Sequence, residues 1–297
     1  MDRTDAGVSS RRCGKSLGLT LDEIVAALHE RDEAHASCAT QRWRLEAALD
    51  RHLRARQTAC GNVEPMPLFV LVHSPSVGPS TWQAVADRLR DAGHKAVVPS
   101  LLSVGQGGPP YWPKVVASVR AGLSGTDAPQ PLVLAAHSNA GLFLPMIASE
   151  LGRAVACSIF ADASVPPPGG STPVAEDDFL PFLRGLADDS GRLPQWTSWW
   201  DEEDVAPMLP DPRVRQVVVE EQPRLPLDYY LEDVPVPAGW DQHRCGYLLF
   251  SQAYEAQAAE ACRRGWPVRT VPGEHLHQVV DPAGVTSALL ELADAAA

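Results

Sequence analysis

The sequence predicts an α/β fold, with a doubly wound and mostly parallel sheet that carries helices on both of its faces. Apolar runs of strand length alternate with amphipathic runs of helix length from residue 67 onward. The runs 68–72 and 132–136 are apolar at every position, as expected for strands that helices cover on both sides. A polar triplet, residues 137–139, joins the second run directly to a helix-forming run. Such sheets bind their ligands at the carboxyl ends of the strands.

The overall composition favours a small-molecule ligand. The chain of 297 residues has a formal net charge of -12, which argues against the basic surface that a nucleic-acid partner requires. No apolar run approaches the roughly 20 residues of a membrane-spanning helix. The six cysteines are widely spaced without a Cys-x-x-Cys pair, so neither a zinc site nor a disulfide framework is predicted. We therefore expect a cytoplasmic protein with no metal, no cofactor and no nucleic-acid or membrane partner, while a homo-oligomer stays compatible with the sequence.

The first 65 residues are expected to form a helical extension. Thr20 and Glu23 make a capping box, and Leu21, Ile24 and Leu28 follow at helical spacing. The charged residues around them are typical of a solvated helix face and indicate no function. The main domain is therefore predicted to span residues 66–297.

Within the main domain, strands and helices are predicted to alternate. Glycines at positions 93, 152 and 265 end three of the helices, since glycine readily adopts the left-handed conformation of a helix end. The predicted strands are 67–72, 95–99, 131–136, 154–162, 246–250 and 267–271, and the predicted helices run from Ser80 to Gly93, from 112 to 123, from 140 to 151 and from 254 to 264.

The alternation of strands and helices stops between about residues 165 and 245, where Pro, acidic residues, Trp and Tyr accumulate. An insertion that follows the carboxyl end of a strand lies over the ligand crevice, where it excludes water and supplies aromatic walls. We predict a helical cap here and expect Trp199 and Trp200 to contact the ligand. The acids at 201–204 are expected on a solvated rim or at a helix start rather than on a metal.

Ser138 is the candidate nucleophile. It stands in the middle of the polar triplet, and the residues two positions to either side, Ala136 and Ala140, are small, with Gly141 next. This pattern is a variant of the Gly-x-Ser-x-Gly turn that exposes a serine between a strand and a helix. A serine in an ordinary strand-to-helix loop would look similar, but the flanking strand and helix are the context that the motif requires. A serine nucleophile also needs a base, and His275 and His277 follow the last predicted strand.

These features resemble the α/β-hydrolase superfamily, in particular its small-molecule esterase and hydroxynitrile-lyase branch, over about residues 67–293. In that superfamily the late histidine commonly stands seven residues before a proline. His275 stands seven residues before Pro282, so the resemblance implies His275 as the base, with His277 as the alternative.

The resemblance leaves more than one position for the acid that orients the histidine. The loop after the penultimate strand usually carries it, and here that loop holds Tyr254 and Glu255. In other branches the acid stands about 24 residues after the nucleophile, which is the position of Asp162. A carboxylate in an otherwise apolar strand is costly to bury without a partner, which also favours Asp162. Glu255, or a Ser-His dyad without an acid, is the alternative.

The resemblance also implies an oxyanion hole made by two backbone N–H groups. One belongs to Asn139 and the other to the loop that begins at His73. Pro75 occupies the usual donor position in this loop and has no N–H group, so Ser74 or Ser76 would have to donate through backbone or hydroxyl. His73 is expected on the substrate side of the same loop.

The sequence therefore predicts a serine hydrolase that cleaves an ester, thioester or lactone of an apolar small molecule through Ser138, His275 and Asp162. One alternative is a cofactor-independent lyase or cyclase in which His275 is a general base and Ser138 only donates a hydrogen bond, which the proline at position 75 favours. The other alternative is a ligand-binding pseudoenzyme on the same fold.

Overall fold

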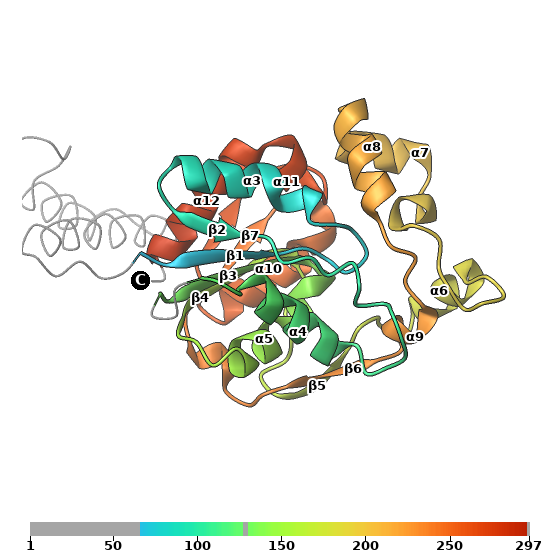
Figure 1. The fold of residues 1–297 in the computed structure, drawn as a ribbon, viewed down its shortest axis with the longest axis horizontal. Coiled ribbons are helices and arrows are strands. Elements are labelled where there is room, and N and C mark those ends of the chain that lie inside the picture. Colours follow the sequence, from blue (N-terminus) through green and yellow to red (C-terminus); the bar gives the residue numbers. More distant parts are fainter. Residues whose placement is uncertain (1–65, 127–129, 296–297) are drawn as a thin grey trace, which may run out of the picture.

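The computed structural model describes residues 66–126 and 130–295 (Figure 1). The predicted helical extension over residues 1–65 lies outside the described residues. The described part contains a six-stranded sheet in the order β2-β1-β3-β4-β7-β8, in which every neighbouring pair is parallel. The predicted doubly wound parallel sheet is thereby confirmed. The strand order reverses between β1 and β3, and ligands of such sheets bind outside the strand ends at this reversal.

The elements of the sheet layer lie within a few residues of their predicted positions. Strand β2 is shorter than predicted, because its pairing with β1 covers only three residues and Pro99 has no N–H to continue it. The strands are β1 (Leu68–Val72), β2 (Lys95–Val97), β3 (Leu132–Ser138), β4 (Val155–Ala163), β7 (Cys245–Leu249) and β8 (Val268–Thr270). The helices are α3 (Ser80–Asp91), α4 (Trp112–Gly122), the 3₁₀ helix η1 (Asn139–Phe143), α5 (Leu144–Glu150), the 3₁₀ helix η4 (Gln252–Tyr254), α10 (Glu255–Arg263), α11 (His277–Val280) and α12 (Pro282–Ala295).

Helices cover both faces of the sheet (Figure 1). Helices α3 and α12 pack on one face, where Phe69 and Leu71 of β1 join their apolar side chains. Helices α4, α5 and α10 pack on the other face, against Leu68 and Val70 of the same strand. Successive side chains of a strand point to opposite faces, so a strand between two helical layers must be apolar at each position.

The chain between β4 and β7, residues 164–244, forms a separate group of short elements, which we call the 164–244 segment. Its helices α6 to α9 lie beyond the carboxyl ends of the sheet strands (Figure 1). The segment contains β5 (Gly170–Pro173), α6 (Leu180–Leu186), the 3₁₀ helix η2 (Trp196–Trp199), α7 (Glu202–Met208), α8 (Pro212–Glu221), α9 (Leu227–Tyr230), β6 (Asp233–Val236) and the 3₁₀ helix η3 (Trp240–Gln242).

The 164–244 segment is not purely helical, which differs from the prediction. Strands β5 and β6, from its two ends, pair in an antiparallel ladder with Thr172 opposite Val234. Next to this ladder, the Glu232 carboxylate accepts hydrogen bonds from the N–H groups of Tyr111 and Trp112 at the start of α4. The ladder and the carboxylate hold both ends of the segment close to the sheet layer. None of the helices in residues 66–126 and 130–295 has the length and apolar character needed to cross a membrane.

Candidate active site

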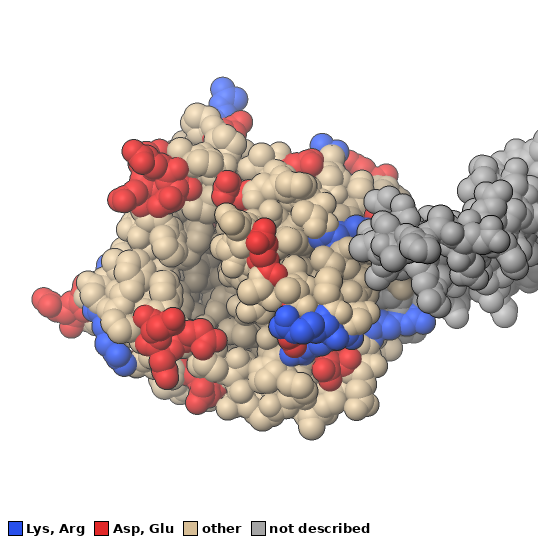
Figure 2. Space-filling view, turned by 180° about the vertical axis from the view of Figure 1, so that it is seen from behind, with Lys and Arg blue, Asp and Glu red and all other residues tan. Residues whose placement is uncertain are grey.

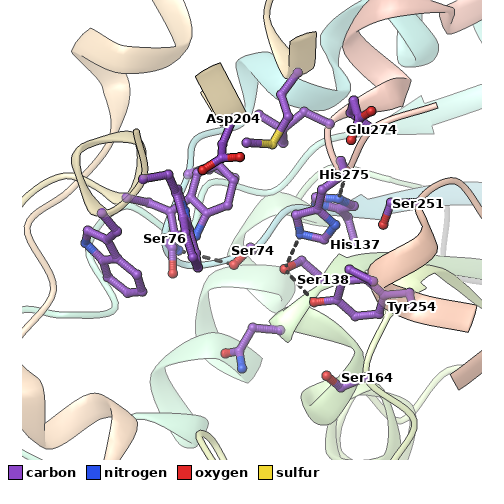
Figure 3. A pocket seen from close by; sticks show the side chains of 18 of the residues that line it. Ser74, Ser76, His137, Ser138, Ser164, Asp204, Ser251, Tyr254, Glu274 and His275 are labelled. Carbon is purple, nitrogen blue, oxygen red and sulfur yellow. Dashed lines mark hydrogen bonds between the residues drawn. The ribbon is translucent and has the colours of Figure 1, made fainter. Parts of the chain in front are cut away.

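A cavity of about 670 Å³ lies between the carboxyl ends of the strands and the 164–244 segment. Figure 3 shows side chains from several separate loops converging on it. The loop after β1 contributes Ser74 and Ser76, the turn after β3 contributes Ser138 and Asn139, the loops after β7 and β8 contribute Tyr254 and His275, and the 164–244 segment contributes Trp196, Trp199 and Trp200.

Ser138 ends β3 in a strained backbone conformation, with φ 60° and ψ -134°. Such a conformation costs about 1–3 kcal/mol in a residue other than glycine and occurs mainly at functional sites. The turn also brings η1 against β4, because a Cβ on Gly141 would lie only 2.4 Å from the Ser164 carbonyl oxygen. The small residues after Ser138 therefore serve this close approach, which leaves the serine hydroxyl at the wall of the cavity.

Asp162 is placed by a β-bulge near the end of β4. His137 of β3 pairs with Ala161 and Ser138 pairs with Ala163, so Asp162 is an additional residue in the ladder, with φ 45°. The bulge directs its carboxylate to the end of β7. There Oδ1 accepts hydrogen bonds from the N–H groups of Phe250 (2.9 Å) and Ser251 (3.0 Å), and Oδ2 accepts one from the Ser251 hydroxyl (2.6 Å).

The Asp162 carboxylate is ionised although it is fully buried. Burial alone would raise its pKa, but the hydrogen bonds from His275 and Ser251 outweigh this effect and hold the pKa below the ordinary 3.8. A buried carboxylate with this many donors is a fixed negative charge that attracts the proton of a neighbouring imidazole.

His275 connects Asp162 to Ser138. Its Nδ1 lies 2.8 Å from Asp162 Oδ2, and its Nε2 lies 2.9 Å from Ser138 Oγ. Because an ionised carboxylate can only accept, Nδ1 carries the proton and Nε2 is left to accept the hydrogen bond from the Ser138 hydroxyl. This arrangement can remove the proton of a serine as the serine attacks an electrophile.

The two alternative residues from the sequence lie elsewhere. The His277 ring packs against Phe250, with 6.0 Å between ring centroids, and does not line the cavity. Its ring fills the space beside Gly273, where a Cβ would lie 1.9 Å from His277 Nδ1. Glu255 is exposed at the start of α10, also outside the cavity lining. The structure therefore brings His275 and Asp162 to Ser138, and neither His277 nor Glu255.

Two aromatic side chains hold the imidazole of His275 on its faces. Tyr254 stacks on it with 4.8 Å between centroids and 4° between ring planes, and His137 lies at 4.5 Å and 33°. His137 Nε2 also hydrogen-bonds the His275 carbonyl at 2.7 Å. No role is predicted from the sequence for His137, Ser251 or Tyr254. All three stand at the carboxyl ends of strands, which was the available signal.

The expected oxyanion donors differ in which of their N–H and O–H groups are engaged in hydrogen bonds within the protein. Asn139 begins η1, and the first N–H groups of a helix have no acceptor within that helix. Its side chain is engaged by the 164–244 segment, since Nδ2 donates to the Val174 carbonyl (2.9 Å) and Oδ1 accepts from the Tyr229 hydroxyl. Of Asn139, therefore, the backbone N–H is the group left to face a substrate.

The two serines of the loop after β1 are also not equivalent. The Ser76 hydroxyl hydrogen-bonds the Tyr230 hydroxyl at 2.8 Å, and its N–H donates to Ser74 Oγ at 3.4 Å. Ser74 Oγ accepts this bond, which leaves its own proton for a further acceptor. The Ser74 hydroxyl thus has a proton available to replace the N–H that Pro75 lacks.

His73 does not line the cavity, which corrects its expected place among the substrate-binding residues. It is fully buried, its Nδ1 hydrogen-bonds the Ser74 carbonyl (2.8 Å) and its Nε2 accepts from the Leu101 N–H (2.9 Å). Both ring nitrogens are therefore used in fixing the loops after β1 and β2. His73 supports the shape of the site without reaching its interior.

The aromatic wall contains the two predicted tryptophans and one more. Trp199 and Trp200 both line the cavity, as does Trp196, which is not among the residues predicted to contact the ligand. Trp196 lies 6.1 Å from Trp200 and 6.0 Å from His275 between ring centroids, and Trp199 lies 5.6 Å from Tyr230. Among the residues described by the structure, no group of three or more His, Cys, Asp or Glu is arranged to hold a metal ion.

The two buried histidines beside the site make the stability of the protein depend on pH. Burial lowers the pKa of His73 to about 4 and that of His137 to about 3, from the ordinary 6.5. At pH 5 both rings are neutral in the folded protein, whereas the unfolded chain protonates them. The unfolded state then binds more protons, so each histidine lowers the free energy of unfolding by about 2 kcal/mol at pH 5.

We expect denaturant titrations to show this loss between pH 7 and pH 5. The stability that the lowered pKa of Asp162 contributes is lost only as the pH falls below the ordinary value of 3.8, which lies outside this interval. His73→Gln, whose amide oxygen can accept from the Leu101 N–H, should reduce the loss by about 2 kcal/mol. A loss equal to that of the wild type in this variant would contradict the assignment.

Known proteins share the fold described above. The model of the "Alpha/beta hydrolase family" matches residues 69–294, whereas no curated protein matches the sequence. An extracellular alpha/beta-hydrolase from a Paenibacillus species has a similar structure, with a TM-score of 0.59 and 16% identity over 76% of this chain and 98% of that chain.

Two further solved structures are similar to a comparable degree. Polyneuridine aldehyde esterase has a TM-score of 0.56 and 16% identity, over 76% of this chain and 99% of that chain. Tomato Methylketone Synthase I in complex with 2-tridecanone has a TM-score of 0.57 and 14% identity, over 79% of this chain and 100% of that chain. At such low identities these structures show a shared fold alone, but the family model covers most of the sequence, and the chain belongs to the alpha/beta hydrolase family.

Proposed function

We propose that the protein is a serine hydrolase that cleaves an ester or lactone of an apolar small molecule. The observation that carries this proposal is the continuous hydrogen-bonded series from Asp162 through His275 to the Ser138 hydroxyl at the wall of the cavity. Ser138 is the nucleophile and His275 is the base. Asp162 orients the imidazole and stabilises its protonated form. The 164–244 segment acts as a cap that keeps bulk water from the reacting groups.

In the first half of the reaction, Ser138 Oγ attacks the substrate carbonyl carbon while its proton passes to His275 Nε2. The Asp162 carboxylate stabilises the imidazolium that forms. The Asn139 N–H and the Ser74 hydroxyl donate to the oxyanion. When the tetrahedral intermediate collapses, His275 returns the proton to the leaving oxygen. Water then attacks the acyl-serine by the same steps, which frees the acid and restores Ser138.

The lining of the cavity supports an apolar substrate without negative charge. Three tryptophans form one wall, and the charged lining side chains are all acidic: Glu176, Asp178, Glu203, Asp204 and Glu274. No Lys or Arg is found among the described residues that line the cavity. Figure 2 shows acidic side chains gathered around a hollow on one face of the molecule. A cleft with charges of one sign repels ligands of that sign, so neutral esters and lactones are favoured over polyanionic thioesters.

The similar solved structures support ester cleavage as well as a second candidate. Polyneuridine aldehyde esterase is an esterase by name, whereas Methylketone Synthase I is not. Pro75 leaves the loop after β1 without the usual backbone donor. This observation favours, as the second candidate, a lyase reaction in which His275 removes a proton and Ser138 only donates a hydrogen bond.

A fluorophosphonate probe separates the two candidates. We expect the wild-type protein to be labelled on Ser138 and to hydrolyse p-nitrophenyl esters, because Oγ is a nucleophile in the proposed mechanism. Ser138→Ala should abolish both, as measured by mass spectrometry of the probe adduct and by release of p-nitrophenol. Labelling that survives Ser138→Ala would show that another residue is the nucleophile, and a wild type that is neither labelled nor hydrolytic would favour the lyase.

Asp162→Asn should lower kcat for p-nitrophenyl esters by about 10³–10⁴-fold. The neutral amide can donate to Nδ1, which would place the proton of the imidazole on Nε2, where it cannot accept from Ser138. Glu255→Gln is the matched control, since Glu255 is exposed and outside the cavity, and its kcat should stay within twofold of the wild type. A large loss in Glu255→Gln with a small one in Asp162→Asn would reverse the assignment of the acid.

The acidic lining should select against anionic acyl groups. We expect kcat/KM for p-nitrophenyl butyrate to exceed that for the mono-p-nitrophenyl ester of succinate by about tenfold or more at low ionic strength, and the ratio to shrink as salt screens the carboxylates. Asp204→Asn should also reduce the ratio, whereas Glu150→Gln, an exposed acid on α5 away from the cavity, should not. Equal rates for the two esters at every salt concentration would contradict the selection.

A further inference from the structure

Tyr254 lies against both reacting residues of the site. It ends η4, the short turn after β7, and its ring is parallel to the His275 imidazole. Its hydroxyl lies 3.5 Å from Ser138 Oγ, on the opposite side of Ser138 from Ser74 (Figure 3). Ser138 Oγ therefore has two neighbours with hydrogen-bonding capacity, the Nε2 atom of His275 and the phenol of Tyr254.

The direction of the hydrogen bond between Tyr254 and Ser138 follows from the protons that are already assigned. Asp162 accepts from His275 Nδ1, so Nε2 has no proton and accepts from the Ser138 hydroxyl. The single proton of Ser138 is then used. The lone pairs of Oγ remain, and the Tyr254 hydroxyl is the donor that faces them. The Ser164 hydroxyl, the other side-chain partner of Tyr254, can donate to the phenol oxygen and so leaves the phenol proton to Oγ.

Tyr254 keeps its proton under all conditions in which the imidazole can act as a base. Burial raises its pKa to about 12. The phenol is therefore neither a competing base nor an anion beside the Asp162 carboxylate. It is a fixed neutral donor whose ring position is set by stacking on His275.

We propose that Tyr254 is a further catalytic residue, whose hydroxyl donates a hydrogen bond to Ser138 Oγ and stabilises the negative charge that develops on this atom. This inference rests on the proposed function, because it assigns Oγ the role of nucleophile. A hydrogen bond to the charged form of a group favours that form. The bond thus eases the loss of the Ser138 proton, whereas the Asn139 N–H and the Ser74 hydroxyl act on a different atom, the substrate oxygen.

The same hydrogen bond acts in both halves of the reaction. In acylation, the Ser138 proton moves to His275 Nε2 while the bond from Oγ to the carbonyl carbon forms, and Tyr254 O–H points at Oγ as the charge builds. In deacylation, the bond from the carbonyl carbon to Oγ breaks, and the proton on Nε2 returns to Oγ. Tyr254 keeps its own proton throughout, so it changes no step of the proton balance.

The test is the rate at which a fluorophosphonate labels Ser138, because labelling is a single displacement in which Oγ attacks phosphorus and fluoride leaves, without a deacylation step. Tyr254→Phe keeps the stacked ring and removes the hydroxyl. We expect its second-order labelling rate constant to fall about 10–100-fold, with a similar fall in kcat for p-nitrophenyl esters and a KM within about threefold of the wild type. Tyr111→Phe, which removes a tyrosine hydroxyl outside the cavity lining, should label at the wild-type rate.

A labelling rate in folded Tyr254→Phe that matches the wild type within twofold would overturn the role of the hydroxyl and leave the proposed function intact. A wild type that is not labelled on Ser138 would overturn both. Should Tyr254→Phe fail to fold, 3-fluorotyrosine at position 254 decides the question, since it keeps the shape of the side chain and makes its hydroxyl a stronger donor. Faster labelling with this residue supports the proposal, and an unchanged rate overturns it.

Discussion

The buried carboxylate of Asp162 is the group on which the geometry of the site depends. An unpaired charge in the interior costs several kcal/mol, and here two N–H groups, a hydroxyl and an imidazole compensate it. These donors come from the end of β7 and from the loop after β8, so satisfying one charge draws the ends of three strands together. The bulge in β4 aims the carboxylate at them. The position of His275 and the arrangement of the loops around it therefore both follow from the need to compensate the charge of Asp162.

The parts of the site that the sequence predicts are those with a local signature. Ser138 stands between a strand and a helix in the chain itself, so its turn can be recognised within ten residues. Asp162 interrupts an apolar strand, and a charge in such a place implies a partner even when the partner is unknown. The alternation of strands and helices likewise gives the sheet and places His275 at the same edge. Each inference needs only the periodicity of one segment and the rule that parallel strands end together.

The remaining features depend on contacts between segments far apart in the chain, which the position of a residue at the end of a strand does not specify. His73 follows β1 in the same way as a substrate-binding residue would, but Leu101, 28 positions later, takes its free nitrogen. Tyr254 occupies a position where the family resemblance suggests an acid. Its contacts depend on η4, which places the Tyr254 ring in a stack on the His275 imidazole. Among the tryptophans, Trp196 approaches His275 only because of the path of the 164–244 segment.

Because Pro75 has no N–H, it affects which class of substrate the proposed oxyanion hole suits. In the proposed mechanism the Ser74 hydroxyl replaces the missing backbone N–H. A backbone N–H is rigidly held whereas a hydroxyl can rotate, so the hydroxyl stabilises an oxyanion less effectively. A site with a weaker oxyanion hole suits carbonyls whose intermediates collapse easily, such as esters and lactones, better than amides, whose leaving group is poor. The donor that we propose for Tyr254 acts on the Ser138 oxygen instead of on the substrate oxygen. In the proposed mechanism, the carbonyl oxygen of the substrate therefore has one backbone donor fewer than usual, and the Oγ atom of Ser138 has one additional donor.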